Sequence, residues 1–176
     1  ATKKFIRPAL FADPKINHIT ADARNFLLLS EKNYDVIISV LSLPIEFASA
    51  SLLTKEFFSL ANKRLKENGI FVQWVDYYLL SKEDIRTLIR TFAAVFSNTV
   101  VWHTKNNIIM LVGSDEPFAL SPDDVKEKVA AGSPENADTF FLGMGPEQVR
   151  NAAWITGQTN TDDLPVLEFR LAQSVI

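Results

Sequence analysis

The feature that most constrains the fold is an alternation between short apolar runs and longer amphipathic segments. The run YDVIIS, Tyr34–Ser39, contains three consecutive β-branched aliphatic residues and predicts a buried strand. A segment over Leu52–Asn68 follows, with apolar residues at helical spacing, and then comes a second strand-like run, IFVQWV, over Ile70–Val75. This alternation predicts an α/β fold with a largely parallel sheet.

The pattern continues on both sides of this unit. Upstream, it predicts the end of a helix over Ala1–Phe11, a strand over Lys15–Ala21 and a short helix over Asp22–Ser30 with Asp22 as a possible N-cap. Downstream, Ser81 and Asp84 form a capping box that opens a helix with a buried stripe ending at Phe96. Two strands, Thr99–His103 and Ile108–Val112, then predict a closing antiparallel hairpin.

After Gly113 the chain becomes richer in proline and charged residues. This part predicts a helix beginning at Ser121-Pro122, a turn at Gly143–Glu147 leading into a short helix through Ala153, and a strand-like VLEF run at Val166–Phe169. We expect residues 1–114 to belong to one Rossmann-like domain and residues 115–176 to form a helical or irregular extension packed on it.

Composition excludes several function classes. The net charge of −3 over 176 residues shows no footprint for nucleic acid, and no apolar run approaches the length of a membrane span. The absence of cysteine excludes disulfides and thiolate metal sites and fits a reducing compartment. We therefore expect a cytoplasmic protein with no nucleic-acid partner and no membrane segment in this chain.

Common catalytic motifs are absent. The two histidines, His18 and His103, lie on different predicted strands without clustered ligands, so we expect no metal site. No G-x-S-x-G elbow or P-loop is present, and Gly143-x-Gly145 lacks a third glycine. The pair Asp162-Asp163 precedes a proline and is more typical of a turn than of catalytic carboxylates.

Two residues sit where a doubly wound sheet binds ligands, which is the carboxyl edge of its strands. Asp22 follows one predicted strand, and its carboxylate could accept hydrogen bonds from an adenine amino group or a ribose hydroxyl, or simply cap a helix. Gln73 lies near the end of the Ile70–Val75 strand and could orient a polar substrate, or it could be a buried residue bonded to backbone.

Taken together, the runs DPKINHITADARNFL, YDVIIS, LLTKEFFSLANKRLKENGIFVQWV, LSKEDIRTLIRTFAAVFSNTVVW and IIMLVGS resemble the spermidine synthase-like aminopropyltransferases. The tail TNTDDLPVLEF resembles the ending of bacterial members of this group. The resemblance implies part of the class I S-adenosylmethionine-dependent methyltransferase fold, without its first strands and with a closing β-hairpin. It also implies an ancestral transfer of an aminopropyl group from decarboxylated S-adenosylmethionine to a polyamine.

The resemblance also assigns roles to individual residues. Asp22 matches the acid that contacts the adenine end of the nucleoside, Ala23 matches its small neighbour, and Gln73 matches a glutamine that borders the substrate pocket. The ligand would be decarboxylated S-adenosylmethionine or S-adenosylmethionine, bound weakly because the family's upstream Gly-rich turn and ribose-binding acid lie outside this chain. The second partner would be a polyamine or another small molecule.

One departure from the family concerns the loop after the YDVIIS strand. Family members carry a D-S-S-D-P type loop there, whose carboxylates hold the attacking amine and take its proton. Aligned on Pro44, this chain has Val40 and Leu43 at the two acid positions, and Glu46 lies beyond the proline. Neither aliphatic residue can act as a base, so the resemblance predicts no catalytic residue and no activity for this chain.

Two further functions stay open: a nucleoside-dependent methyltransferase, and a non-catalytic assembly or regulatory module. The apolar Val36 strand would have an open edge, and exposed apolar edges recruit partners. We therefore expect either a homo-oligomer formed through this strand or direct pairing of the Ile16 and Val36 strands.

Overall fold

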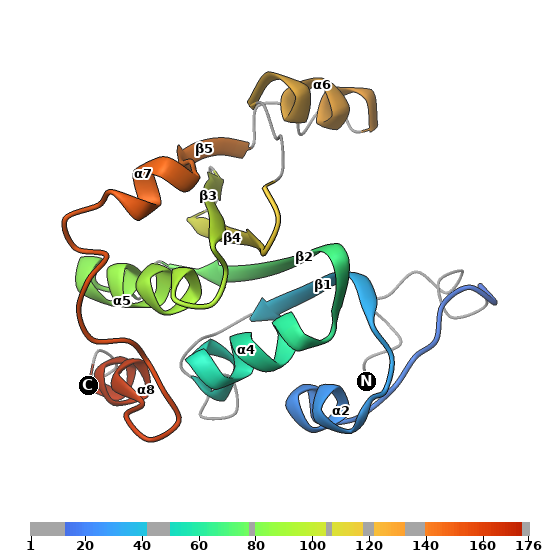
Figure 1. Cartoon of the computed structure of the whole chain (residues 1–176), viewed down its shortest axis with the longest axis horizontal. Coiled ribbons are helices and arrows are strands. Elements are labelled where there is room, and N and C mark those ends of the chain that lie inside the picture. Colours follow the sequence, from blue (N-terminus) through green and yellow to red (C-terminus); the bar gives the residue numbers. More distant parts are fainter. Residues whose placement is uncertain are drawn as a thin grey trace. The chain divides into compact units, whose positions relative to one another are not determined.

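The computed structural model of the chain describes residues 13–41, 50–77, 80–104, 107–117, 122–132 and 140–173 (Figure 1). The chain divides into two compact units, Ala1–Ser30 and Glu31–Ile176. The predicted helix end at the start of the chain lies outside the described residues.

The first unit contains the short helix α2, Ala23–Leu29. Asp22 is its N-cap, because the Asp22 carboxylate accepts a hydrogen bond of 2.8 Å from the backbone N–H of Asn25. The helix predicted over Asp22–Ser30 is therefore confirmed.

The strand predicted over Lys15–Ala21 is wrong. Residues 15–20 are exposed and form no regular structure, and the backbone N–H of Ile16 donates back to the carbonyl of Asp13 in a turn. A strand needs a neighbour to satisfy its backbone groups, and no described strand pairs with this segment. The alternative of direct pairing between the Ile16 and Val36 strands is therefore wrong as well.

The second unit is built on a five-stranded sheet with the order β1-β2-β4-β3-β5. The strands are β1 (Tyr34–Leu41), β2 (Leu65–Asp76), β3 (Asn98–Thr104), β4 (Ile108–Ser114) and β5 (Phe140–Met144). The strands predicted at YDVIIS and IFVQWV and the closing hairpin of β3 and β4 are confirmed.

Strand direction differs from the expectation of a largely parallel sheet. Among the described strands, β1 and β2 are parallel, whereas β2–β4, β3–β4 and β3–β5 are antiparallel. The hairpin inserts β4 between β2 and β3, so β4 runs opposite to both of its neighbours. The antiparallel β3–β4 pair is the predicted hairpin, whereas the antiparallel pairs β2–β4 and β3–β5 show that the expectation of a largely parallel sheet is wrong.

An aromatic cluster joins the sheet to α4 (Lys55–Lys63) and α5 (Lys82–Ala93). The ring centroid of Phe71 on β2 lies 5.8 Å from that of Phe92 and 5.5 Å from that of Phe96, in stacked arrangements. Each of the five cluster members is at most 2% exposed: Phe57, Phe58, Phe71, Phe92 and Phe96. The buried stripe predicted for α5 therefore forms the core on this face of the sheet.

The predicted capping box of α5 is confirmed. The Ser81 hydroxyl accepts a hydrogen bond from the backbone N–H of Asp84, and the Asp84 carboxylate accepts one of 3.0 Å from the backbone N–H of Ser81.

A second, smaller cluster occupies the other face of the sheet. Val100, Trp102 and Val112 are buried there. The residues packed against them are Ile70, Val72, Met110 and Val125, the last from α6 (Pro122–Gly132). Helical side chains therefore contact both faces of the sheet, as in a doubly wound fold.

The helix predicted over Leu52–Asn68 is wrong at both ends. A short 3₁₀ turn, η2 (Ser51–Leu53), precedes α4, and α4 ends at Lys63. The carbonyl of Arg64 accepts a hydrogen bond of 2.8 Å from the backbone N–H of Tyr34. The residues directly after α4 therefore pair with β1 instead of continuing the helix. Regular pairing with β1 begins at Ile70, where the strand was predicted to start.

The C-terminal part adds β5, α7 (Pro146–Arg150) and α8 (Val166–Gln173). The predicted turn is wrong at Gly143, which lies in β5, whereas Gly145 caps α7. The short helix ends at Arg150 and does not continue to Ala153.

The strand-like VLEF run is wrong, because these residues form α8. Pro165 precedes the helix and accepts a hydrogen bond from the backbone N–H of Phe169. Leu167 is 1% exposed, and its backbone N–H donates to the Asn160 side chain. Tertiary contact with the segment at Asn160 therefore decides the conformation of this run.

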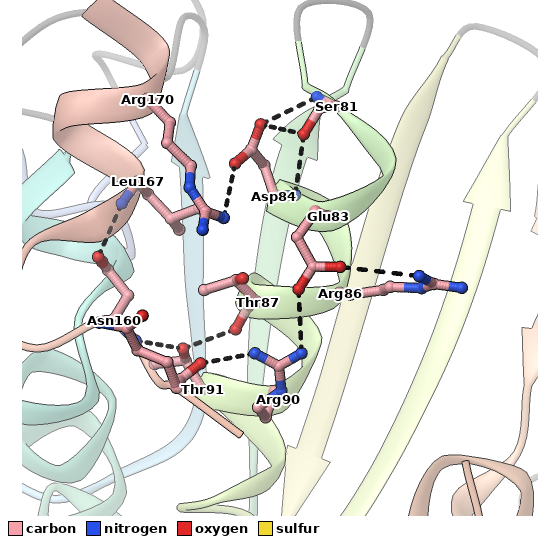
Figure 2. Close-up of polar contacts among 11 residues, drawn as sticks. Ser81, Glu83, Asp84, Arg86, Thr87, Arg90, Thr91, Asn160, Leu167 and Arg170 are labelled. Atoms are coloured by element: carbon pink, nitrogen blue, oxygen red, sulfur yellow. Dashed lines mark hydrogen bonds and ion pairs between the residues drawn. The ribbon is translucent and has the colours of Figure 1, made fainter. Parts of the chain in front are cut away.

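Figure 2 shows the contacts that hold the C-terminal segment against α5. The Arg90 guanidinium donates to the carbonyl of Trp154 at 2.9 Å and to that of Gln158 at 2.6 Å. The guanidinium of Arg170 reaches the Asp84 carboxylate at 3.4 Å. The C-terminal segment therefore packs on α5 through partly buried polar contacts.

Candidate functional site

The candidate site lies at the carboxyl ends of the parallel strands β1 and β2. Ser39 stands opposite Gln73 in the ladder, and Val40 stands opposite Trp74. In open α/β sheets ligands bind beyond this edge. These two residue pairs therefore lie at the ligand-binding position that the sequence predicts.

Val40, one of the two predicted degenerate positions, lies on β1 with its side chain 65% exposed. The second position, Leu43, and the alternative acid, Glu46, belong to residues 42–49, outside the described part of the chain. Because Val40 and its neighbour Trp74 carry no titratable group, this part of the edge cannot accept a proton.

Gln73 is fully buried rather than open at a pocket. Its side-chain amide donates to the carbonyl of Ser39 at 3.3 Å and to that of Trp74 at 3.0 Å. Its oxygen Oε1 has no hydrogen-bond partner within the described parts of the chain. Since a buried acceptor without a partner costs free energy, Oε1 is an unsatisfied acceptor among the described residues.

Asp76 is an acid at this edge that our sequence reasoning missed. It is the last residue of β2 and is half-buried. Side chains two positions apart share a face of a strand, so Asp76 lies on the same face as Trp74. The sequence contained the information needed to find it, because Asp76 directly follows the predicted strand IFVQWV.

Asp22 and Ala23 lie at the start of α2 in the first unit, and both are exposed. The Oδ1 atom of Asp22 caps the helix, and the described contacts leave Oδ2 without a partner. One carboxylate can therefore cap the helix and still accept a hydrogen bond from a ligand. The structure describes Asp22 and Gln73 in separate units, each by itself.

The remaining candidates form no site in the described ranges. No group of three or more His, Cys, Asp or Glu residues there could hold a metal ion. The backbone N–H of Asp162 donates to the Glu56 carboxylate at 2.9 Å, and both acids of the Asp162-Asp163 pair are exposed in a bend. No helix among these residues is long and apolar enough to cross a membrane.

Two cavities lie away from these residues. One, of about 270 Å³, lies at the start of β2 and includes Asn62, whose amide donates to the Asp115 carboxylate at 3.1 and 2.9 Å. The other, of about 340 Å³, lies between Phe96, Val149 and Ile155. Neither is lined by Asp22, Val40 or Gln73.

Solved structures are similar to this fold. The chain matches a probable spermidine synthase from Corynebacterium glutamicum with a TM-score of 0.57 at 21% identity, over 82% of this chain and 53% of that one. It also matches a spermidine synthase solved with the transition-state analogue AdoDATO, with a TM-score of 0.54 at 19% identity, over 95% of this chain and 52% of that one. The chain therefore has the α/β fold of class I methyltransferases over about half of each structure.

Sequence relatives point to the same family. Polyamine aminopropyltransferase 2 of Aquifex aeolicus is 28% identical over 142 residues, which cover 78% of this chain and 29% of the relative. The polyamine aminopropyltransferase of Synechococcus strain JA-3-3Ab is 43% identical over 63 residues, or 35% of this chain and 20% of the relative. The chain thus spans less than a third of the length of these relatives.

The family model described as the spermine/spermidine synthase domain matches residues 1–106, which is more than half of the chain. The predicted resemblance is thereby confirmed, and the chain belongs to the spermine/spermidine synthase family.

Proposed function

We propose that the protein descends from enzymes that transfer an aminopropyl group from decarboxylated S-adenosylmethionine to a polyamine, and that this chain does not catalyse the transfer. The observation that carries the proposal is Val40, an exposed aliphatic residue at the end of β1 where the family resemblance expects an acid. The family membership supports the ancestral reaction, and Val40 supports its loss.

The chemical reason is the charge of the nucleophile. A polyamine amine is protonated at neutral pH and must lose its proton before it can attack carbon. Leu43, the other replaced position, is likewise unable to accept this proton. Without a base at either position, the reactive form of the amine is scarce.

The carboxylate of Asp22 suits the adenine end of an S-adenosyl nucleoside, because it can accept a hydrogen bond from the adenine amino group. Its Oδ2 can accept a hydrogen bond from an exocyclic amino group while Oδ1 caps α2, and Ala23 presents no bulky side chain beside it. A bound decarboxylated S-adenosylmethionine would supply the electrophilic aminopropyl carbon beside its sulfonium. We expect binding to be weak, because Asp22 is exposed to water that competes for its hydrogen bonds.

Gln73 is proposed to border the polyamine position. Its amide group is held by the carbonyls of Ser39 and Trp74, which leaves Oε1 as the acceptor for an ammonium or amine N–H. The role is positioning, since an amide oxygen does not take a proton at neutral pH.

Calorimetric titration with methylthioadenosine tests the nucleoside part of the proposal. Asp22→Asn retains a helix cap, because Asn caps as well as Asp, but removes the carboxylate. We expect weak binding to the native chain, at least tenfold weaker binding to Asp22→Asn, and no change for the control Asp13→Asn, another exposed acid of the same unit. Equal affinity of native chain and Asp22→Asn would overturn this role.

A turnover assay tests the loss of catalysis. We expect no putrescine-dependent release of methylthioadenosine from decarboxylated S-adenosylmethionine above the rate without protein. Turnover that disappears in Asp76→Asn would refute the proposal, since it would identify Asp76 as a replacement base at the end of β2.

Methyl transfer is the second candidate, and it is favoured by the same aliphatic Val40. An acceptor that is not protonated at neutral pH can attack the methyl carbon of the sulfonium without a base, and the bond to sulfur then breaks to release S-adenosylhomocysteine, so this reaction loses less when the acids are replaced. Methylation by S-adenosylmethionine of a small molecule whose acceptor atom is not protonated at neutral pH, with no aminopropyl transfer, would favour this candidate. A non-catalytic assembly module is favoured by the exposed apolar side chains of β1.

We also retain the proposed division into residues 1–114 and an extension over residues 115–176. Two contacts support a packed extension: β5 pairs with β3, and Arg90 bonds to the carbonyls of Trp154 and Gln158.

A further inference from the structure

The cavity of about 340 Å³ is bordered by the end of α5, the start of β3 and the helix α7. Its volume falls at the lower end of the range of small-molecule sites, which is about 300–1,000 Å³. Ala93 and Phe96 line it from the end of α5 and the turn that follows, Thr99 lines it from β3, and Val149 lines it from α7. The cavity is therefore large enough for a small molecule.

The apolar wall of this cavity is part of the folded core. Phe96 is fully buried, and its ring centroid lies 4.7 Å from that of Phe92. Val149 is 1% exposed. The Thr99 hydroxyl donates to the carbonyl of Phe96 at 2.9 Å and so holds the turn between α5 and β3. A ligand would therefore meet a preformed apolar surface, which keeps the entropic cost of binding low.

The charge at this cavity has one sign. Among the described residues that line it, Arg150 is ionisable and no acid is present. Arg150 is exposed, and its guanidinium makes no ion pair or hydrogen bond within the described parts of the chain. Glu147, three residues earlier on α7, is exposed and does not line the cavity. The N–H donors of Arg150 are therefore available to an anion.

A hydroxyl group accompanies the guanidinium. Ser97 lines the cavity and is exposed, and its side chain makes no hydrogen bond with the residues that the structure describes. A carboxylate can accept parallel hydrogen bonds from an arginine and a further one from a hydroxyl. Its apolar body would contact Phe96 and Val149. A polyamine does not suit this cavity, because it would bring positive charge to Arg150.

The cavity is separate from the candidate site at β1 and β2. In the sheet order β4 lies between β2 and β3, so Gln73 and Thr99 belong to strands that do not pair. Neither Gln73 nor Val40 lines the cavity. Binding at this cavity is therefore independent of nucleoside binding and of turnover.

We propose that this cavity binds a small carboxylate with an apolar body, and that Arg150 selects the negative charge. The apolar wall stabilises the complex by removing the body of the ligand from water. The guanidinium provides the preference for an anion over a neutral molecule of the same shape.

An NMR titration of the isotope-labelled chain tests the proposal with phenylacetate as the probe and phenylacetamide as its neutral counterpart. We expect phenylacetate to shift the backbone N–H signals of Ser97, Val149 and Arg150, with a dissociation constant on the order of 1 mM for so small a ligand. Phenylacetamide should bind about three- to fivefold more weakly, because an exposed ion pair contributes about this factor.

Three variants accompany the titration. Arg150→Gln should bind phenylacetate as weakly as the native chain binds phenylacetamide. The control Lys128→Gln removes the same charge from an exposed position on α6, away from the cavity, and should leave both affinities unchanged. Ala93→Leu adds apolar volume inside the cavity and should weaken both probes at least fivefold, in a chain whose NMR spectrum remains well dispersed.

Equal affinity of the native chain for the two probes, or of Arg150→Gln and the native chain for phenylacetate, would overturn the role of Arg150. Shifts confined to residues outside the cavity, or no shifts at about ten times the expected dissociation constant, would overturn the site. Unchanged affinity in a folded Ala93→Leu would overturn it as well. Arg150→Gln changes an exposed side chain, so it decides the question even where Ala93→Leu does not fold.

Discussion

Asn160 donates a hydrogen bond of 3.0 Å from its side-chain amide to the backbone carbonyl of Leu53, across 107 residues of sequence. Its side-chain oxygen accepts a bond of 3.0 Å from the backbone N–H of Leu167, and its own backbone N–H donates to the Thr91 hydroxyl at 2.8 Å. The residue is fully buried. One side chain therefore joins the η2 turn and α8, while its backbone bonds to α5. Figure 2 shows the bonds of Asn160 to Leu167 and Thr91.

Replacing Asn160 with alanine should lower the free energy of unfolding by about 2–4 kcal/mol, because the buried groups of Leu53 and Leu167 would lose their partners. Urea unfolding measures this loss. The control is Gln158→Ala, an exposed position that contributes only its carbonyl, and it should change the free energy by less than about 0.5 kcal/mol. Equal losses for the two variants would contradict the importance of the Asn160 amide.

Replacing Arg90 with lysine should cost about 1–3 kcal/mol, because a lysine ammonium cannot reproduce the bonds from Nε and Nη1 to the carbonyls of Trp154 and Gln158. Hydrogen exchange should show faster opening of residues 154–167. The matched control is Arg86→Lys, whose guanidinium contacts Glu83 at 3.7 Å and is 36% exposed, and we expect a loss below about 1 kcal/mol. Unchanged exchange in Arg90→Lys would count against this anchoring.

Replacing Gly113 with alanine should destabilise the aromatic core. A Cβ atom at Gly113 would lie 2.5 Å from Cγ of Phe96 and 2.6 Å from Cε1 of Phe92, so the rings would have to move. Overpacking of this kind costs about 1–3 kcal/mol. The control is Gly132→Ala, where nothing lies within 4 Å of the new atom. The urea midpoint should fall for the first variant and stay the same or rise for the second.

Asp35 should contribute a small acid-dependent part of the stability. Its hydrogen bond with Lys66, reinforced by the opposite charge, holds the pKa of the Asp35 carboxyl below its ordinary value of 3.8. The unfolded state therefore binds the proton more readily, so the contribution is present above about pH 4 and is lost as the pH falls through the folded-state pKa.

Acid titration of the native chain and of Asp35→Asn, followed by circular dichroism, measures this contribution. We expect the two proteins to differ slightly at pH 6 and to converge at low pH. Because the pair is exposed, molar salt should also reduce the difference at pH 6. A difference that grows as the pH falls would have the wrong sign for this ion pair.

Several elements were predictable because their signals are local. The Asp22 cap, the Ser81–Asp84 capping box and the strand at Ile70–Val75 each depend on residues that lie close together in the sequence. For the same reason, the position of Val40 at the end of a strand could be predicted from the sequence.

The incorrect predictions share a different cause. Lys15–Ala21 has the pattern of a strand, but no described strand pairs with it. Val166–Phe169 is also strand-like in composition, but these residues form a helix. Asp76 was missed because its significance depends on which strand ends lie side by side. Local composition does not determine which segments will form hydrogen bonds with the backbone N–H and C=O groups of a strand-like run.

The sequence by itself determined the family, the α/β alternation and the helix caps, because the order of the motifs and the local hydrogen bonds depend on residues that are close together in the chain. Only the tertiary structure decided that Gln73 is buried, with no partner for its side-chain oxygen among the described residues, and that Asn160 joins distant elements. Burial and long-range pairing depend on contacts between residues far apart in the chain, and no local pattern specifies them.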